Sequence, residues 1–198
     1  MHRKVAVGVA VGAAVVIVTG ALLGGCTGRK DAVANGPRSG DQGYITKDKS
    51  IRVIGADDRV PAPTVRGDSL DGGTLDLRDL VGQVVVVNFW ASWCPPCRAE
   101  QPRLNDAYSA NKAKGVAFLG VDYRDDNAQA QAFRRTHDVA YPSIVDYPGS
   151  TMLDFKVPLE PPSTVVIDRQ GRTAARIIGQ TPRGVLEPIL EQLAAEKA

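Results

Sequence analysis

Cysteine and histidine are scarce in this 198-residue chain, which has three cysteines and two histidines. A structural zinc site takes four ligands of these types. Besides one Cys-x-x-Cys pair, the candidates are Cys26, His2 and His137, and the first two lie in a segment typical of an export signal. Covalent haem attachment needs a histidine directly after the second cysteine of such a pair, and Arg98 stands there. We therefore expect neither a metal site nor an attached haem.

The chain also has little net charge, with 24 basic and 22 acidic residues. Removing residues 1–25 takes away Arg3 and Lys4 and no acid, so 22 residues of each sign remain. A nucleic-acid-binding domain usually carries a strongly basic face. No nucleic acid is expected among the partners of this protein.

A single long uncharged run is present, the 19 residues Val5–Leu23, and a short basic start precedes it. The Leu-Gly-Gly-Cys sequence that ends at Cys26 resembles the lipobox of bacterial lipoproteins. This resemblance implies a signal peptide over residues 1–25 and a mature chain anchored by an acylated Cys26. The alternative is an uncleaved anchor, because 19 residues are nearly enough to span a bilayer. In both cases the basic end stays inside and the domain faces outward.

The segment that follows is rich in glycine, serine and charged or polar residues and has few large apolar groups. Such a composition is typical of a flexible linker. We predict a flexible tether over residues 26–58 and one compact domain over residues 59–198.

Strand and helix signals alternate along this domain. The continuous apolar run over residues 84–90 is typical of a central buried strand, and a helix is expected over 95–114 with a kink at Pro102. The other expected elements are a hairpin of 64–66 and 74–76, a strand over 116–121, a helix over 127–137, a hairpin of 164–168 and 173–178, and a helix over 182–196 with Pro182 in its first position. This order predicts an α/β fold with a mixed sheet.

Cys94 and Cys97 stand where the buried strand ends and the helix begins. The free N–H groups and the dipole of a helix start favour an anion, so a thiol pKa of about 8.5 can fall to roughly 3.5–7.5. We expect Cys94, at the exposed end, to be the nucleophile and Cys97 to be the resolving thiol. An inert structural bridge is the alternative, but closing so short a loop removes little chain entropy.

From about residue 61 to residue 194 the chain resembles the TlpA/ResA group of thioredoxin-fold proteins, the membrane-tethered thiol-disulfide oxidoreductases of bacterial cell envelopes. The resemblance rests on residues 86–100, on residues 162–168 and on Gly171 in the terminal hairpin. It implies a thioredoxin fold with a mixed central sheet flanked by helices, an N-terminal β-hairpin and a central insertion at about residues 125–158.

The resemblance also assigns roles to two prolines. Pro162 matches the family's cis-proline, which lies beside the cysteines and shapes the groove where a partner's backbone docks. From the residues alone an ordinary turn proline is favoured, because Pro158, Pro161 and Pro162 crowd together. Pro161 departs from the usual β-branched or aliphatic residue and has no N–H to offer a bound peptide.

Glu100 matches the acidic residue that ResA-like members use near the redox pair. A carboxylate one turn beyond a buried thiol can accept its proton as a mixed disulfide resolves. The alternative is a first-turn acid favoured by the helix dipole. Asn88 stands where thioredoxin itself carries a buried aspartate, so that proton relay is absent.

Three further residues complete the expected substrate-binding surface. Trp93 is expected to pack beside the attacking sulfur and shield it, with plain core packing as the alternative. Pro95 and Pro96 stiffen the loop and donate no N–H, which leaves the thiolate less stabilised and the couple more reducing. Together with Pro161 and Pro162, these residues would contact a partner protein.

The resulting prediction is an enzyme that exchanges thiols and disulfides in proteins through its own cysteine pair, without another cofactor. The resemblance favours a reductase, with apocytochrome c as one substrate and a membrane protein as electron donor. It would be lipid-anchored at the outer face of the bacterial cytoplasmic membrane and act on extracytoplasmic proteins. An oxidant of exported thiols, which would pass its electrons to a membrane acceptor, is the alternative.

Two other functions are disfavoured by particular residues. A peroxidase of the peroxiredoxin branch would have threonine or serine three residues, and proline seven residues, before the attacking cysteine, where this chain has Ala91 and Val87. A non-catalytic binding module would not need the intact cysteine pair. His137 is expected at a helix end, and the acids Asp122, Asp125 and Asp126 are expected to cap a helix and form a turn.

Overall fold

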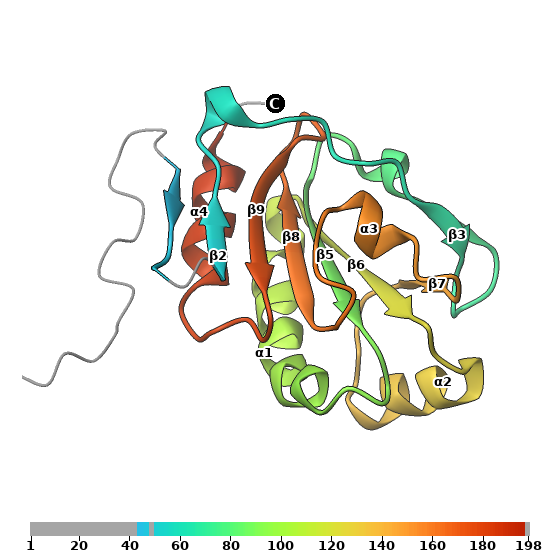
Figure 1. The fold of residues 1–198 in the computed structure, drawn as a ribbon. Helices are drawn as coiled ribbons and strands as arrows, with labels where there is room; N and C mark the ends of the chain where they lie inside the picture. The colour runs from blue at the N-terminus through green and yellow to red at the C-terminus, as the bar shows by residue number, and fades with distance from the viewer. Residues whose placement is uncertain (1–42, 48–49, 197–198) are drawn as a thin grey trace, which may run out of the picture. The chain divides into compact units, whose positions relative to one another are not determined.

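The computed structural model describes residues 43–47 and 50–196 of the chain. These residues form a seven-stranded sheet in the order β1-β2-β9-β8-β5-β6-β7 and a separate two-stranded sheet of β3 and β4 (Figure 1). The strands are β1 (Tyr44–Ile45), β2 (Ile51–Val53), β3 (Arg66–Asp68), β4 (Thr74–Asp76), β5 (Val84–Trp90), β6 (Val116–Tyr123), β7 (Ser143–Asp146), β8 (Ser163–Ile167) and β9 (Thr173–Ile178). The helices are α1 (Pro95–Asn111), α2 (Asn127–Thr136), α3 (Thr151–Asp154) and α4 (Leu186–Ala195).

Strand β5 lies in the interior of the large sheet and is followed by helix α1. It pairs in parallel with β6 and antiparallel with β8, and all seven of its residues are buried. A strand covered on both faces has no solvent side, which explains why the sequence over 84–90 is apolar without alternation. The mixed sheet and the central strand confirm the predicted thioredoxin fold.

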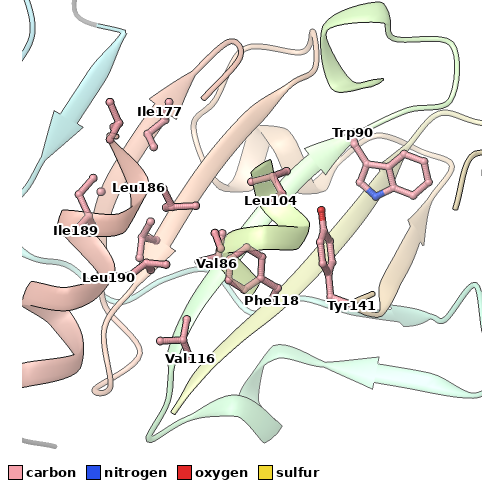
Figure 2. Close-up of a cluster of buried hydrophobic side chains, with 14 of the residues drawn as sticks. Val86, Trp90, Leu104, Val116, Phe118, Tyr141, Ile177, Leu186, Ile189 and Leu190 are labelled. Carbon is pink, nitrogen blue, oxygen red and sulfur yellow. The ribbon is translucent and has the colours of Figure 1, made fainter. Parts of the chain in front are cut away.

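The two faces of the sheet bury separate cores. Residues of β5 and β6 that point to one face, such as Val86 and Phe118, pack with Leu104 of α1 and with Leu186 and Leu190 of α4 (Figure 2). The alternate residues of the same strands point to the other face. There they pack with Met152 of α3 and with Phe155 and Val157 in the segment that follows it. The helices α1, α2 and α4 therefore cover one face, and α3 covers the other.

Most predicted elements occur, with shifted ends. Helix α1 ends at Asn111 and a short 3-10 turn continues it to Lys114, and Pro102 lies inside α1. The hairpin of β3 and β4 and that of β8 and β9 are both formed. The prediction for the last helix was wrong at its start: α4 begins at Leu186, so Pro182 lies in the preceding turn rather than at its first position.

The predicted boundary at residue 59 was also wrong. Strand β2 pairs antiparallel with β9, and Ile51, Val53 and Ile54 are buried. These three side chains are part of the folded domain, so a tether cannot extend to residue 58. Strand β1 adds a further antiparallel partner at the sheet edge.

The apolar segment Val5–Leu23 and Cys26 lie outside the described residues. Within residues 43–47 and 50–196, no helix has the length and apolar character that crossing a bilayer would require. The lipid-anchor prediction therefore stays a prediction.

Candidate active site

A disulfide joins Cys94 and Cys97 at the start of α1. Cys94 is the residue that caps this helix, and the backbone N–H of Cys97 donates to its sulfur at 3.2 Å. In the disulfide state Cys94 is 2 % exposed and Cys97 is 1 % exposed. The expectation that Cys94 occupies an exposed end is therefore wrong for the oxidised protein.

Pro95 and Pro96 are the first two residues of α1, and both are exposed. Proline suits the first helical position but has no N–H. The first backbone donor inside the helix is therefore the N–H of Cys97, the one that contacts Cys94. A helix that begins without prolines would offer the capping sulfur further N–H groups.

The loop before β8 reaches the disulfide from the opposite side. The peptide bond between Pro161 and Pro162 is cis, as the resemblance implies for Pro162. The carbonyl oxygen of Pro161 lies 3.5 Å from the sulfur of Cys94, close enough to accept a hydrogen bond from the reduced thiol. Both prolines are buried. The structure thus brings together two segments that are more than sixty residues apart in the sequence.

Glu100 lies one turn beyond Cys97 and is buried, with 1 % of the residue exposed. The side-chain amide of Asn88 donates to one carboxyl oxygen at 3.0 Å, and the N–H of Thr181 donates to the other at 2.8 Å. Burial raises the pKa of Glu100, and these two hydrogen bonds oppose that rise. The explanation as a first-turn acid fails because α1 has no acid in its first turn and this side chain points inward.

The polar surroundings of Glu100 extend to residues that the sequence did not single out. Asn88 also contacts the hydroxyl of Thr164 on β8 at 3.3 Å, and that hydroxyl lies 3.3 Å from the hydroxyl of Thr181. Arg103 donates to the carbonyl of Thr181 at 3.1 Å and its charge favours ionised Glu100. Asn88 replaces the buried aspartate expected from thioredoxin, but the site still contains a buried acid, because Asn88 binds Glu100.

Trp93 does not pack into the core. It is 50 % exposed, its indole N–H donates to the carbonyl of Arg124 at 3.2 Å, and its ring centroid lies 6.5 Å from that of Tyr123. The alternative of core packing is therefore wrong. An exposed aromatic ring directly before Cys94 offers an apolar surface to a bound partner.

The three acids after β6 have three different environments. Asp126 caps α2 by accepting from the N–H groups of Ala128 and Gln129, as predicted. Asp125 instead accepts hydrogen bonds from Ser92, two residues before Cys94. Asp122 is fully buried. The sequence did not predict the contacts of Asp125 or the burial of Asp122, because both depend on the residues of β5 and of the loop after it that lie beside them in the folded protein.

His137 follows α2 as its C-terminal cap and its ring lies 4.6 Å from that of Phe133, which confirms its predicted place at a helix end. In the described part of the chain, no three His, Cys, Asp or Glu side chains are grouped as a metal ion would require. The groups gathered at this site are the cysteine pair and the buried acids Glu100, Asp122 and Asp125.

Comparison with known proteins places these features in a family. The profile of the AhpC/TSA family matches residues 58–176. The thiol-disulfide oxidoreductase ResA of Bacillus thuringiensis is 31 % identical over 153 residues, which cover 77 % of this chain and 84 % of the relative. The thiol:disulfide interchange protein HelX of Rhodobacter capsulatus is 37 % identical, covering 69 % and 77 %.

Solved structures of similar proteins have the same fold. A secreted thiol-disulfide isomerase from Corynebacterium glutamicum superposes with a TM-score of 0.71 at 32 % identity, covering 78 % of this chain and all of that one. A DsbF homologue from Corynebacterium diphtheriae gives 0.70 at 28 % identity with the same coverage.

The fold and the disulfide at the start of α1 define a thioredoxin-fold thiol-disulfide oxidoreductase. Within this class the chain belongs to the AhpC/TSA family, and its relatives are of the ResA, HelX and DsbE type.

Proposed function

We propose that this protein is a lipid-anchored disulfide reductase that acts on extracytoplasmic proteins. The observation that carries the direction is the single helix N–H, that of Cys97, which contacts the sulfur of Cys94. A thiolate that receives fewer hydrogen bonds is less stabilised. A less stabilised reduced form makes the couple a stronger reductant.

The exchange follows from the geometry at the start of α1. The Cys94 thiolate attacks a substrate disulfide, one sulfur–sulfur bond forms and one breaks, and the substrate's first thiolate leaves. Cys97 then attacks the mixed disulfide, releases the second substrate thiolate and closes the Cys94–Cys97 bond. Glu100, one turn further along α1, takes the proton that Cys97 loses. Two electrons pass from the protein to its substrate, and a membrane electron donor must restore the dithiol.

The place of action rests on the N-terminal sequence. Acylation of Cys26 would fix the mature protein to the outer face of the bacterial cytoplasmic membrane. Apocytochrome c is one substrate that suits such a reductase, because its haem-attachment cysteines must be reduced. A thiol oxidant with the same anchor and an electron acceptor is the competing function.

The deciding measurement is the reduction potential of the purified full-length protein, titrated in glutathione and dithiothreitol buffers with the thiols counted by alkylation. A value near or below about −250 mV supports the reductase, and a value near −150 mV supports the oxidant. A protein without a reversible couple would contradict both.

Trapping identifies the substrate. Cys97→Ser leaves Cys94 able to attack but removes the resolving thiol, so partners should accumulate as mixed disulfides in cells. Cys94→Ser is the matched control and should trap none through that position. Partner binding that persists unchanged in the double serine variant would favour a binding module without catalysis.

The anchor is tested separately from the chemistry. Growth with an alkyne-labelled fatty acid should label the wild-type protein, and Cys26→Ala should abolish both the label and membrane retention. Membrane retention of an unlabelled Cys26→Ala protein would favour the uncleaved anchor.

A further inference from the structure

The backbone that leads into Cys94 is held from the side by the loop that follows β6. Asp125 accepts from the hydroxyl of Ser92 at 2.8 Å and from the backbone N–H of Ser92. The neighbouring residues form a third link, since the indole of Trp93, directly after Ser92, donates to the carbonyl of Arg124, directly before Asp125. Two consecutive residues of one loop thus fix two consecutive residues of the other.

These contacts are made to a segment with few other constraints. Ser92 and Trp93 belong to no strand or helix, and they connect the last residue of β5 to the cap of α1. The carbonyl of Ser92 accepts from Arg98 on the first turns of α1 at 2.8 Å. Asp125 supplies two of the three hydrogen bonds that tie this connection to the loop after β6.

A second carboxyl group lies beside this loop, that of Asp122, and the side chain with which it shares a hydrogen bond is Asp125. Asp122 is the β6 partner of Trp90 in the sheet register, and none of its surface is exposed. Among the described residues, neither of its carboxyl oxygens has another hydrogen-bond partner. Burying an ionised carboxylate without an ion-pair partner is costly, so such a group stays protonated.

The surroundings of Asp122 contain one charged group that acts on it. Its sheet neighbours are Trp90 on β5 and Val145 on β7, both uncharged. Helix α2 contributes buried Ala130 and Phe133 to the core on this face. Of its two cations, Arg134 pairs with Asp71 and Arg135 is exposed. Among the described residues, neither Asp122 nor Asp125 takes part in an ion pair. The remaining influence is the negative charge of Asp125.

We propose that Asp125 is a positioning residue for thiol-disulfide exchange, holding Ser92 and Trp93 so that Cys94 is presented to its partner, and that buried Asp122 shares its proton with Asp125 to keep the two carboxyl groups at one negative charge. This inference rests on the proposed chemistry of the cysteine pair. Burial and the charge of Asp125 together raise the pKa of Asp122 to about 8. Above that pH the pair gains a second charge close to the segment that carries the redox sulfur.

Intrinsic fluorescence reports on this pair directly. The chain has two tryptophans, Trp90 and Trp93, of which one is the register partner of Asp122 and the other bonds to the residue before Asp125. The titration is performed on the oxidised full-length protein, in which neither redox cysteine has a proton to lose. A fluorescence step centred near pH 8 is expected.

Three variants separate the two carboxyl groups from other causes of the fluorescence step. Asp122→Asn should remove the step. Asp125→Asn should move it to lower pH, because the charge that raises the pKa of Asp122 is gone. Asp126→Asn is the matched control: it makes the same charge change one residue away, and asparagine still caps a helix. It should leave the step in place. A step that survives in Asp122→Asn overturns the proton-sharing part of the proposal.

The positioning role is tested by the rate at which each reduced protein reduces an aromatic disulfide, followed by the absorbance of the thiolate that is released. Asp125→Asn replaces one acceptor oxygen with an NH2 group, and Ser92→Ala removes only the hydroxyl donor. The asparagine variant should react about tenfold more slowly, because small displacements of reacting groups cost rate steeply. Ser92→Ala should lie between it and the wild type, and Asp126→Asn should match the wild type.

The outcomes distinguish this inference from the proposed function. A wild-type protein that does not reduce the disulfide contradicts the proposed chemistry, and with it the positioning role. An active wild type whose rate is matched by both Asp125→Asn and Ser92→Ala, each folded by circular dichroism, overturns the positioning role alone. Equal slowing in Asp126→Asn would also overturn it, since any local charge would then suffice.

Discussion

The side-chain amide of Asn88 donates a hydrogen bond of 3.0 Å to a carboxyl oxygen of Glu100, and both residues are fully buried. The bond joins the central strand β5 to helix α1, one turn beyond Cys97. A carboxyl group in this position is held by neutral donors, the amide of Asn88 and the N–H of Thr181, rather than by a direct ion pair. Its protonation is therefore coupled to both the stability of the fold and the chemistry of the site.

Glu100→Gln should change how stability depends on pH. Burial raises the pKa of Glu100 in the folded protein, so the folded state binds this proton more tightly than the unfolded state does. The associated stability is complete below the unfolded pKa and is lost as pH rises through the folded pKa. The free energy of unfolding of the wild type should therefore fall, relative to that of the variant, as pH rises from about 4.

Urea unfolding at a series of pH values measures this difference. Asp106→Asn is the matched control, because Asp106 is an exposed acid on the same helix. Its pH dependence should parallel that of the wild type. Parallel curves for Glu100→Gln and the wild type would contradict the link between burial of Glu100 and its proton affinity.

The same Glu100→Gln substitution should slow the resolving step of the exchange. In the proposed mechanism Glu100 accepts the proton that Cys97 loses when it attacks the mixed disulfide, and a positioned general base contributes on the order of 10²-fold or more. Quenched reactions with a disulfide peptide should show the mixed disulfide through Cys94 accumulating in the variant. Resolution at the wild-type rate would reduce Glu100 to a structural role.

The elements that could be predicted are those with a strong local signal. The valine run of β5 identifies a strand buried on both faces, and the cysteine pair after it marks a helix start. Strand β2 could not be found in this way, because Ile51, Arg52 and Val53 form a short segment in polar surroundings. Its pairing partner on β9 lies more than a hundred residues away.

The parts of the site that could be predicted are likewise those with a local signal in the sequence. The spacing of Glu100 from Cys97 is visible along one helix, whereas its donors Asn88 and Thr181 come from other parts of the chain. Asp125 resembles any acid in a turn until β5 and β6 pair and bring Ser92 beside it. Contacts between distant segments depend on which strands pair in the sheet, and the sequence of one strand does not identify its partner.

Arg59→Met should destabilise the domain strongly. The guanidinium group of Arg59 is 1 % exposed and pairs with Asp168 at 3.2 Å and with both carboxyl oxygens of Glu196. Breaking a buried ion pair typically costs about 3–5 kcal/mol. Asp168 keeps its ion pair with Arg172 at 2.8 Å, so the main loss is at Glu196, and the expected cost lies at the lower end of that range. Arg78→Met is the control, because Arg78 pairs with Asp76 at the surface with 65 % of its side chain exposed.

Thermal and urea unfolding of the two arginine variants should differ clearly. The Arg78 variant should unfold close to the wild-type midpoint, since exposed ion pairs contribute little. Similar midpoints for both variants would show that the Arg59 cluster contributes no more than a surface pair.

A chain that begins at residue 59 should be less stable than one that begins at residue 43. The shorter chain lacks β1 and β2 and exposes the core surface that Ile51, Val53 and Ile54 cover. Full burial of one such aliphatic side chain contributes about 1.5–3 kcal/mol, so the combined loss should be readily measured by urea unfolding. Equal stability of the two chains would restore the predicted tether boundary at residue 58.

Trp93→Ala should affect partner recognition more than folding. The ring is half exposed and loses one hydrogen bond, that to the carbonyl of Arg124, so the midpoint of unfolding should move little. Trp90→Ala provides the contrast, because Trp90 is buried and stacks on Phe133 at 4.6 Å, and such a truncation costs about 3–5 kcal/mol.

Comparing a protein substrate with a small disulfide isolates the contribution of Trp93 to binding. The Trp93→Ala variant should show a lower kcat/KM toward a disulfide-containing protein and a rate near that of the wild type toward a small aromatic disulfide, because only the larger substrate extends over the ring. If both rates fell by the same factor, Trp93 would instead act on the Cys94 segment through its bond to Arg124. In that case the Trp93 ring would help to position the segment before Cys94, as Asp125 does through Ser92. The contact with the substrate would then have to come from the cis-proline loop.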